Sequence, residues 1–536
     1  MASFLLDAAF LGLCAGGLRW PWAWSLAAAV LWAAAWAYPP RLRGAPLFLW
    51  AACLLWAAVS AAASSEPLNS LAAFARFSVP VLLVLSASGR FSEDDRKGLF
   101  WRLCAAALLA SALVFLLRQA SLTGTGLYSH VNYTACLLAC AFAAALAGLL
   151  GRAPEEDPAW TAALRFAAAL SLAAVLALRS RAALGACFAG AAVVLWRRGS
   201  RKTLLALALV LPAALAVAPR EALKLDLPSA SVRPRIWSAA LEVVGDHPLL
   251  GEGPGLFERG FLRHQVSAPA GYPTRFALSS AHAHSELLQS AAETGVVGAA
   301  LLVLALAASL ILAWRRPPSS WAAEAALACA AAFLAQALVD NPSALPALGW
   351  AGALALAAAC PELPEGGRRW AGVWRGLCAA GVALSLLAWW PSWALKTRSP
   401  GAALRIAPGD PSLWEALARE QLKRSPPDLA ASLASMQEAS RLSPSNAVYR
   451  LALSELHGVR GDWPAAAAQA RAAGELEPSS PQARLLLAEA FCRLGRAGEA
   501  RAAQDEALRL AQGAPSPETA YDRFVLGARR VPGGCL

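Results

Sequence analysis

The chain has 536 residues, of which 58% are hydrophobic and only 15% are charged. Soluble globular chains carry about 25% charged and 45–50% apolar residues, so this composition excludes an ordinary soluble domain. The formal net charge is +12, but much of the lysine and arginine falls in short stretches between apolar blocks, a pattern typical of membrane-protein loops and not of nucleic-acid binding.

The apolar blocks are about 17–25 residues long, enough to cross a hydrocarbon layer of about 30 Å. Backbone groups in lipid must be hydrogen-bonded within the segment, so each block is expected to be a helix. The fold class predicted is all-α, a polytopic transmembrane helical bundle of about 12–13 spans. The expected spans are 3–18, 20–38, 46–63, 68–87, 99–117, 131–151, 160–178, 182–196, 203–219, 286–313, 320–340, 344–360 and 373–393.

Basic residues in the short loops predict the orientation, because they concentrate on the cytoplasmic side. The strongest basic cluster lies at 197–202. If it is cytoplasmic, all the other basic loops fall on the same side, and loops 64–67 and 341–343 on the other side have almost no Lys or Arg. The chain is therefore expected to be a multi-pass protein of the cell inner membrane with a cytoplasmic N-terminus. The segment 220–285 and the tail are expected in the periplasm.

After Pro400 the chain becomes charged, rich in Ala and Leu, and helical in its apolar spacing. Pro444 and Pro478 lie 34 residues apart, and Pro408 precedes Pro444 by 36 residues. This period resembles that of tetratricopeptide repeats, which usually hold a partner protein or peptide; a plain helical bundle is the alternative. The domains expected are transmembrane helices in 1–219 and 286–395, a long loop in 220–285, a repeat domain in 400–515 and a tail in 516–536.

The long loop holds the residues best suited to chemistry. Four of the six histidines lie in it, together with five arginines after residue 230, and such a loop suits an anionic substrate because guanidinium groups match phosphate oxygens. These residues are His247, His264, His282, His284, Arg233, Arg235, Arg259, Arg263 and Arg275. The scattered cysteines show no paired spacing, and His282 with His284 lacks a nearby third ligand, so no metal site is expected.

Two stretches of the loop stand out. In "RPRIWSAALEVVGDHPLLGEGPGLF", a short amphipathic helix over 236–244 is followed by Pro248 and a tight turn with Gly251, Gly253 and Gly255. Closely spaced glycines let backbone N–H groups approach an oxyanion, although a simple surface turn is the alternative. In "AHAHSELLQSAAETGVVGAALL", His284 lies where the chain re-enters the membrane, and Ser285 is expected to cap the new helix.

These two stretches, in this order and between two spans, resemble the O-antigen ligase and O-antigen polymerase family of membrane glycan transferases. Arg233 and Trp237 match the first family element, and the stretch from His247 to Phe257 matches the second. His284, Leu288, Gln289, Glu293, Gly295 and Gly298 match the third, with Ser285 in place of the family's Asn. A Ser-Arg pair at the outer end of an earlier span matches Ser180 and Arg181.

The resemblance implies transfer or polymerisation of glycan from an undecaprenyl-diphosphate carrier, with inversion and without a metal or cofactor. The acceptor would be a lipid A core, a growing polysaccharide or a protein hydroxyl on the periplasmic face. His284 and Arg233 would be catalytic, with His284 taking the acceptor's proton. Ser180, Arg181, Arg233 and Arg235 would hold the diphosphate. Trp237, His247, Pro248, the turn glycines and Ser285 would support the site.

Other interpretations remain open at this point. Arg181 could anchor a helical hairpin at the lipid headgroups, and His247 could only stabilise its turn. Arg235, Arg259, Arg263 and Arg275 could be solvated loop charges, and His264 a surface residue. A transporter or flippase of lipid-linked oligosaccharide is the alternative function. It would favour ionisable residues deep in several spans, but those found, Asp340 among them, mostly lie near span ends.

Overall fold

A computed structural model gives the fold. It describes residues 2–18, 21–119, 127–128, 130–151, 158–203, 205, 232–264, 280–315, 320–364, 371–389, 399–405, 408–444, 446–478 and 480–512. The described residues form helices, turns and loops and contain no strand. The expected span at 203–219 falls almost wholly outside these ranges, as do Arg275 and the expected tail at 516–536.

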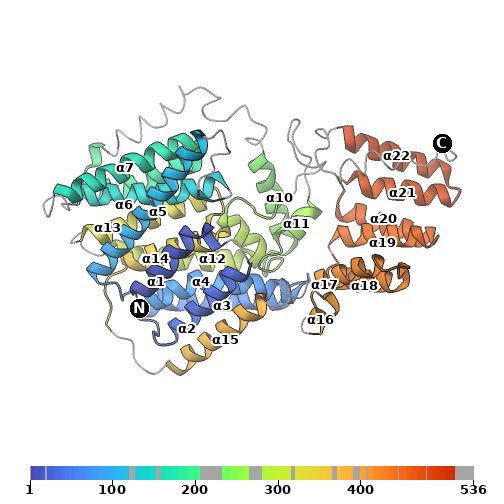
Figure 1. Cartoon of the computed structure of the whole chain (residues 1–536), viewed down its shortest axis with the longest axis horizontal. Coiled ribbons are helices and arrows are strands. Elements are labelled where there is room, and N and C mark those ends of the chain that lie inside the picture. Colours follow the sequence, from blue (N-terminus) through green and yellow to red (C-terminus); the bar gives the residue numbers. More distant parts are fainter. Residues whose placement is uncertain are drawn as a thin grey trace.

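The first half of the chain forms a bundle of apolar helices (Figure 1). These helices are α1 Ala2–Cys14, α2 Pro21–Ala35, α3 Gly44–Ala63, α4 Pro67–Ala87, α5 Glu93–Gln119, α6 Val131–Leu150, α7 Pro158–Leu178 and α8 Arg181–Arg197, with a short 3₁₀ turn η1 Gly16–Leu18. The second half adds α12 Glu286–Trp314, α13 Trp321–Ala337, the 3₁₀ turn η4 Pro342–Ala344, α14 Pro346–Ala359 and α15 Ala371–Trp389. Between the halves lie α10 Val232–Asp246 and α11 Phe257–Arg263.

Each described range that was expected to span the membrane is a helix. Seven are long and apolar enough to cross a membrane, namely α3, α4, α5, α6, α7, α12 and α15. The helices α1, α2, α13 and α14 are apolar but shorter. The all-α, polytopic membrane fold is therefore confirmed. The helix expected at 236–244 is longer than its pattern indicated, because α10 runs from Val232 to Asp246.

Local sequence signals explain where several helices begin. Ser180, Ser285 and Ser320 precede α8, α12 and α13, and each side chain accepts a backbone N–H from the first turn. Such caps satisfy donors that have no partner within the helix. Helices α4 and α14 begin at Pro67 and Pro346, where the missing N–H of proline would have had no helical partner in any case.

Helix α13 lies at the centre of the bundle and packs against α6, α8 and α14. Small residues allow this close approach, since a Cβ added at Gly190 of α8 would lie 2.4 Å from the Cβ of Ala143 in α6. Helices in lipid gain little from the hydrophobic effect and associate mainly through close packing of such residues.

Basic loop residues that the structure describes lie at one end of the bundle, Arg41 and Arg198 among them. Arg41 donates hydrogen bonds to the carbonyls of Gly89 and Leu363, which joins the loops before α3, after α4 and after α14. Arg198, after α8, pairs with Glu324 at the start of α13 at 2.7 Å. The starts of α8 and α12 and the end of α13 lie at the opposite end, where α10 packs against α12 and Arg233 of α10 contacts Asp340.

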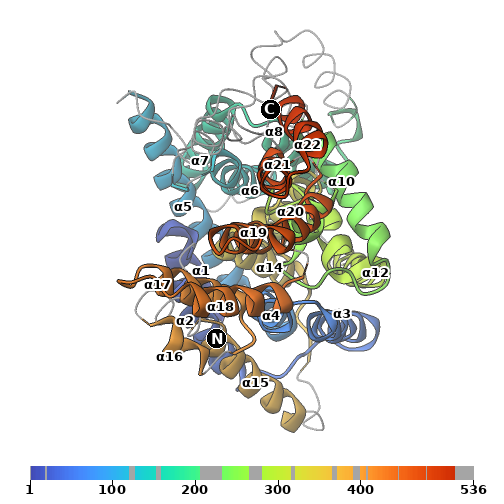
Figure 2. The same ribbon diagram turned by 90° about the vertical axis from the view of Figure 1, so that its right-hand side faces the viewer.

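The tail forms consecutive helical hairpins that stack beside the bundle (Figures 1 and 2). Its helices are α16 Pro400–Leu404, α17 Pro411–Leu422, α18 Leu429–Leu442, α19 Ala447–Val459, α20 Trp463–Leu476, α21 Pro481–Arg493 and α22 Ala497–Gln512. Each of α17, α19 and α21 begins three residues after one of the repeated prolines, Pro408, Pro444 and Pro478. The helical repeat is thus visible, and its assignment to the tetratricopeptide class stays a prediction.

The tail contacts the bundle at the end that carries the long loop. Glu66, between α3 and α4, is only 2% exposed and accepts hydrogen bonds from Asn69 and from Ser443 of the tail. Arg259 of α11 lies 3.6 Å from the same carboxylate. One buried acid therefore contacts the bundle, the long loop and the tail together.

Candidate functional site

The long loop and the α13–α14 connection bring two of the predicted site residues together. Arg233, in the first turn of α10, donates to Oδ2 of Asp340 at 3.1 Å. His284, just before α12, places Nδ1 3.2 Å from Oδ1 of the same carboxylate. The side chain of Asp340 is 2% exposed, whereas those of Arg233 and His284 are each 30% exposed. The cationic and imidazole groups therefore face accessible space with a buried acid behind them.

The carboxylate of Asp340 decides which ring nitrogen of a neutral His284 carries the proton. Burial raises the pKa of Asp340, but the hydrogen bond from His284 and the charge of Arg233 outweigh burial and hold the pKa below its ordinary value. An ionised carboxylate only accepts hydrogen bonds, so Nδ1 of His284 carries the proton that faces it. Nε2 is then left with a lone pair that can accept a proton.

The backbone of His284 supports this orientation. Its φ angle is +50°, a left-handed conformation that is uncommon for a residue with a side chain. Such strained conformations persist only where surrounding contacts hold them, and they cluster at functional sites. The following residue, Ser285, caps α12 through Leu288, as the sequence predicted, and fixes where the helix begins.

Ser180 lies at the same end of the bundle. Its hydroxyl caps α8 and donates to Oδ1 of Asn132 at 3.0 Å, and the carbonyl of Asn132 accepts from Gln336 at 2.8 Å. Gln336 stands at the end of α13, four residues before Asp340. Arg181 is exposed in the first turn of α8. A short polar chain thus links the Ser-Arg pair to the segment that carries Asp340.

The other two residues of the first motif lie along α10. Arg235 is exposed. Trp237, one turn after Arg233, is partly buried, and its Nε1 is inaccessible and has no hydrogen-bond partner among the described residues. Arg233 and Trp237 lie four residues apart and share one face of the helix.

The glycine turn is seated on a break in α12. Gly295 has φ +71° and ψ 176°, which interrupts the helix and frees the carbonyls before it. The N–H groups of Glu252 and Gly253 donate to the carbonyls of Ala292 and Glu293, each at 2.9 Å, and Val296 donates to the carbonyl of Pro248 at 2.8 Å. Backbone groups of the glycine turn and of the helix break therefore hydrogen-bond to each other.

This geometry revises the role expected of the glycines. Gly251, Gly253 and Gly255 all have positive φ, as a tight turn requires. The acceptor that the turn contacts is a side chain of the protein itself. The carboxyl group of Glu293 accepts backbone hydrogen bonds from Gly255 and Phe257. The alternative interpretation of a structural turn accounts for these contacts.

Residues of the third motif, in α12, contact the loop from the side of the helix. Gln289 accepts from the backbone N–H of Ala283 at 2.6 Å and donates to Glu293 at 2.5 Å. A Cβ added at Gly295 would lie 1.9 Å from the carbonyl oxygen of Leu249, and one at Gly298 would lie 2.2 Å from Oγ1 of Thr294. The Gln, the Glu and the first Gly of the motif therefore reflect how α12 holds the loop.

Several loop charges pair with acids. Arg263 bonds to Glu252 and also lies 2.9 Å from Asp246, and His264 lies 2.7 Å from Asp246. His247 lies 3.4 Å from Glu252. The interpretation of Arg263 and Arg259 as solvated charges was wrong, because both form ion pairs with buried acids, Glu252 and Glu66. The contacts of His247 agree with a role in stabilising the turn.

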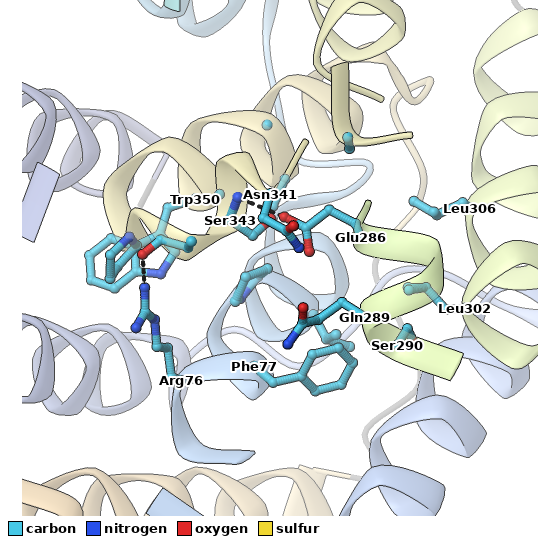
Figure 3. A pocket seen from close by; sticks show the side chains of 18 of the residues that line it. Arg76, Phe77, Glu286, Gln289, Ser290, Leu302, Leu306, Asn341, Ser343 and Trp350 are labelled. Atoms are coloured by element: carbon cyan, nitrogen blue, oxygen red, sulfur yellow. Dashed lines mark hydrogen bonds between the residues drawn. The ribbon is translucent and has the colours of Figure 1, made fainter. Parts of the chain in front are cut away.

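A cavity of about 300 Å³ opens beside this cluster, between α4, α12, α13 and α14 (Figure 3). Its polar end includes Arg76, His282, Glu286 and Asn341, and its far end is apolar. Asn341 and Glu286 directly adjoin the cluster along the chain, since they follow Asp340 and His284 by one and two residues. Burial, with Arg76 and His284 nearby, lowers the pKa of His282 to about 4, so this ring is neutral at physiological pH.

Sequence reasoning missed the central acid. The sequence indicates Asp340 only as an ionisable residue near a span end. A signal was present, because an acid followed by Asn-Pro at the outer end of an apolar helix is costly unless it is paired. Among the described residues, no group of three His, Cys, Asp or Glu side chains is placed to hold a metal ion.

Comparison with known proteins adds one finding. Residues 166–303 match the family model described as O-antigen ligase. This range includes Ser180, Arg181, Arg233, the glycine turn and His284. A search of curated proteins finds no match. The family expected from the motifs is therefore confirmed: residues 166–303 of this chain form a domain of the O-antigen ligase family.

Proposed function

We propose that this protein transfers glycan from an undecaprenyl-diphosphate carrier to an acceptor hydroxyl, on the periplasmic face of the inner membrane. The family match supports glycan transfer at the level of the family. The observation that carries the proposal is the joint contact of Arg233 and His284 with the buried carboxylate of Asp340.

The reaction is an in-line displacement. An acceptor hydroxyl oxygen attacks the anomeric carbon of the first sugar while the bond from that carbon to the phosphate oxygen breaks. Nε2 of His284 takes the hydroxyl proton, and undecaprenyl diphosphate leaves with the bonding electron pair. Attack from the side opposite the leaving group inverts the anomeric centre. General-base assistance of this kind contributes about 10²–10⁴ in rate.

Positive groups are needed where the diphosphate leaves, because negative charge grows on its oxygens. Arg233 is the best supported of these groups, since its contact with Asp340 fixes it beside His284. Ser180, Arg181 and Arg235 are proposed as further diphosphate contacts. Trp237, whose buried indole N–H has no partner among the described residues, is proposed to contact the same substrate.

The periplasmic assignment draws on the charge pattern. The basic short loops lie at the end of the bundle opposite Arg233 and His284, and basic loops favour the cytoplasm. The repeat tail lies at the same end as the cluster. It is proposed to bind a partner or acceptor there, as stacked helical repeats commonly do.

The test is glycan transfer by variants expressed at wild-type level. His284→Ala is expected to lower the rate by about 10²–10⁴, and Arg233→Ala by about 10²–10³. His264→Ala and Arg419→Ala are matched controls, because both residues lie outside the cluster and should leave transfer unchanged. Wild-type transfer by both Arg233→Ala and His284→Ala would overturn the proposal, whereas glycan retained on the cytoplasmic side would favour a flippase.

A further inference from the structure

The cavity beside the cluster has two chemically different ends. Arg76, His282, Glu286, Gln289, Glu293 and Asn341 gather at one end. Farther along, side chains of α12 and its neighbours, such as Leu302, Leu306 and Phe333, make an apolar lining. Figure 3 shows Glu286 and Asn341 close together at the polar end, with Leu302 and Leu306 farther along α12.

Most polar groups of the cavity already have partners within the protein. Arg76 donates to the carbonyl of Ala344, and Glu286 accepts from the backbone N–H of Ser343 at 2.8 Å. Asn341 differs, because it is 3% exposed and its Oδ1 has no hydrogen-bond partner among the described residues. An unpaired buried acceptor is costly, so a donor from a ligand would satisfy it.

The charges of the polar end indicate which ligand fits. Arg76 is the single arginine among the residues that line the cavity, which also include Glu286 and Glu293, and the His282 ring is neutral at physiological pH. This set has no excess of positive charge, so it is poorly suited to a diphosphate. Amide and carboxyl oxygens accept hydrogen bonds, and they therefore suit hydroxyl donors.

We propose that this cavity is a second subsite, which binds an amphiphile with an uncharged, hydroxyl-rich head at Glu286 and Asn341 and a hydrocarbon chain along Leu302 and Leu306. The head would lie next to the segments that carry His284 and Asp340. If the proposed function holds, this subsite takes the acceptor, which is then a sugar-bearing lipid embedded in the membrane. Binding itself does not depend on that function.

The test is native mass spectrometry of the purified full-length chain in a polyoxyethylene detergent. Dodecyl maltoside and dodecylphosphocholine, which share one chain length, are added at equal concentration. The wild type is expected to retain one dodecyl maltoside in preference to dodecylphosphocholine. Asn341→Leu removes the unpaired acceptor and Leu302→Trp fills the apolar end, so each should weaken retention by about tenfold, equivalent to about 1.4 kcal/mol.

Two controls separate this inference from the proposed function. Leu304→Trp lies on the same helix but at a residue that is 52% exposed, and it should retain the maltoside. Arg233→Ala should lose transfer and still retain the maltoside. Equal retention by the wild type, Asn341→Leu and Leu302→Trp, or no preference for the maltoside, would overturn the subsite. Normal transfer by Arg233→Ala would instead count against the proposed function, whatever the maltoside does.

Discussion

At the scale of single residues, the proposed chemistry depends on how Asp340 orients Arg233 and His284. Its carboxylate holds Nδ1 of His284 at 3.2 Å and the guanidinium of Arg233 at 3.1 Å. A histidine without this partner could rotate or carry its proton on the wrong nitrogen. In the proposed reaction Asp340 is thus a positioning residue, which acts on the substrate through His284 and Arg233.

The pH dependence of stability tests this arrangement. Because the pKa of Asp340 in the folded chain lies below its ordinary value, the ionised carboxylate stabilises the fold above the ordinary aspartate range. That contribution is lost as the pH falls through the folded-state pKa. Asp340→Asn should therefore cost about 1–3 kcal/mol of unfolding free energy at pH 7, and progressively less in acid. Thermal unfolding of both proteins across pH measures it, and a loss that is equal at every pH would contradict the assignment.

At the scale of elements, the break in α12 holds the loop that carries the motif. The freed carbonyls at 292–294 accept N–H groups from the glycine turn and from Trp56, at 2.9 Å in each case. Ser60 of α3 also bonds to the carbonyls of Leu250 and Glu293. The loop is therefore anchored to two membrane helices, which explains how a long connection can present Arg233 in a defined place.

Gly295→Ala tests the break. The new Cβ would lie 1.9 Å from the carbonyl oxygen of Leu249, and φ +71° is strained for any residue with a side chain. The variant should lose several kcal/mol of stability, as large steric conflicts do, together with glycan transfer. Gly376→Ala in α15 is the matched control, because nothing lies within 4 Å of the added Cβ, and it should be neutral or slightly stabilising. Equal effects of the two variants on denaturation would contradict this role for Gly295.

The sequence predicted the elements far better than the contacts between them. Apolar block length was enough to predict helices at twelve of the expected spans, and seven of these helices are long and apolar enough to cross a membrane. The motifs identified His284 and Arg233 as candidates. Asp340 was not identified, since its partners lie 56 and 107 residues away and pairing over such distances depends on tertiary packing. For the same reason, the contact between the glycine turn and Glu293 could not be predicted from the spacing of the motifs.

At the scale of the whole molecule, the tail is docked on the bundle and is not simply tethered to it. The buried carboxylate of Glu66 accepts from Ser443 and pairs with Arg259 of the long loop. A partner that binds the repeats would therefore act on a body that also contacts the loop. This contact gives a physical route by which the tail and the candidate site could influence each other.

Hydrogen exchange tests the docking. Glu66→Ala removes the buried acceptor and leaves Arg259 without this partner, so amide exchange should become faster around Ser443 and in α11. Glu438→Ala is the control, since Glu438 pairs with Arg441 on the exposed surface of the tail and such pairs contribute little. Unchanged exchange in Glu66→Ala would show that the tail is held by other contacts.

The most direct test of the account is the rate of glycan transfer by His284→Ala, Asp340→Asn and the double variant. If Asp340 acts through His284 and Arg233, the loss in the double variant should be smaller than the product of the two single losses, because the part that Asp340 contributes through His284 has already been removed. If the two losses multiply instead, Asp340 and His284 act independently, and the cluster as described here does not carry out the reaction.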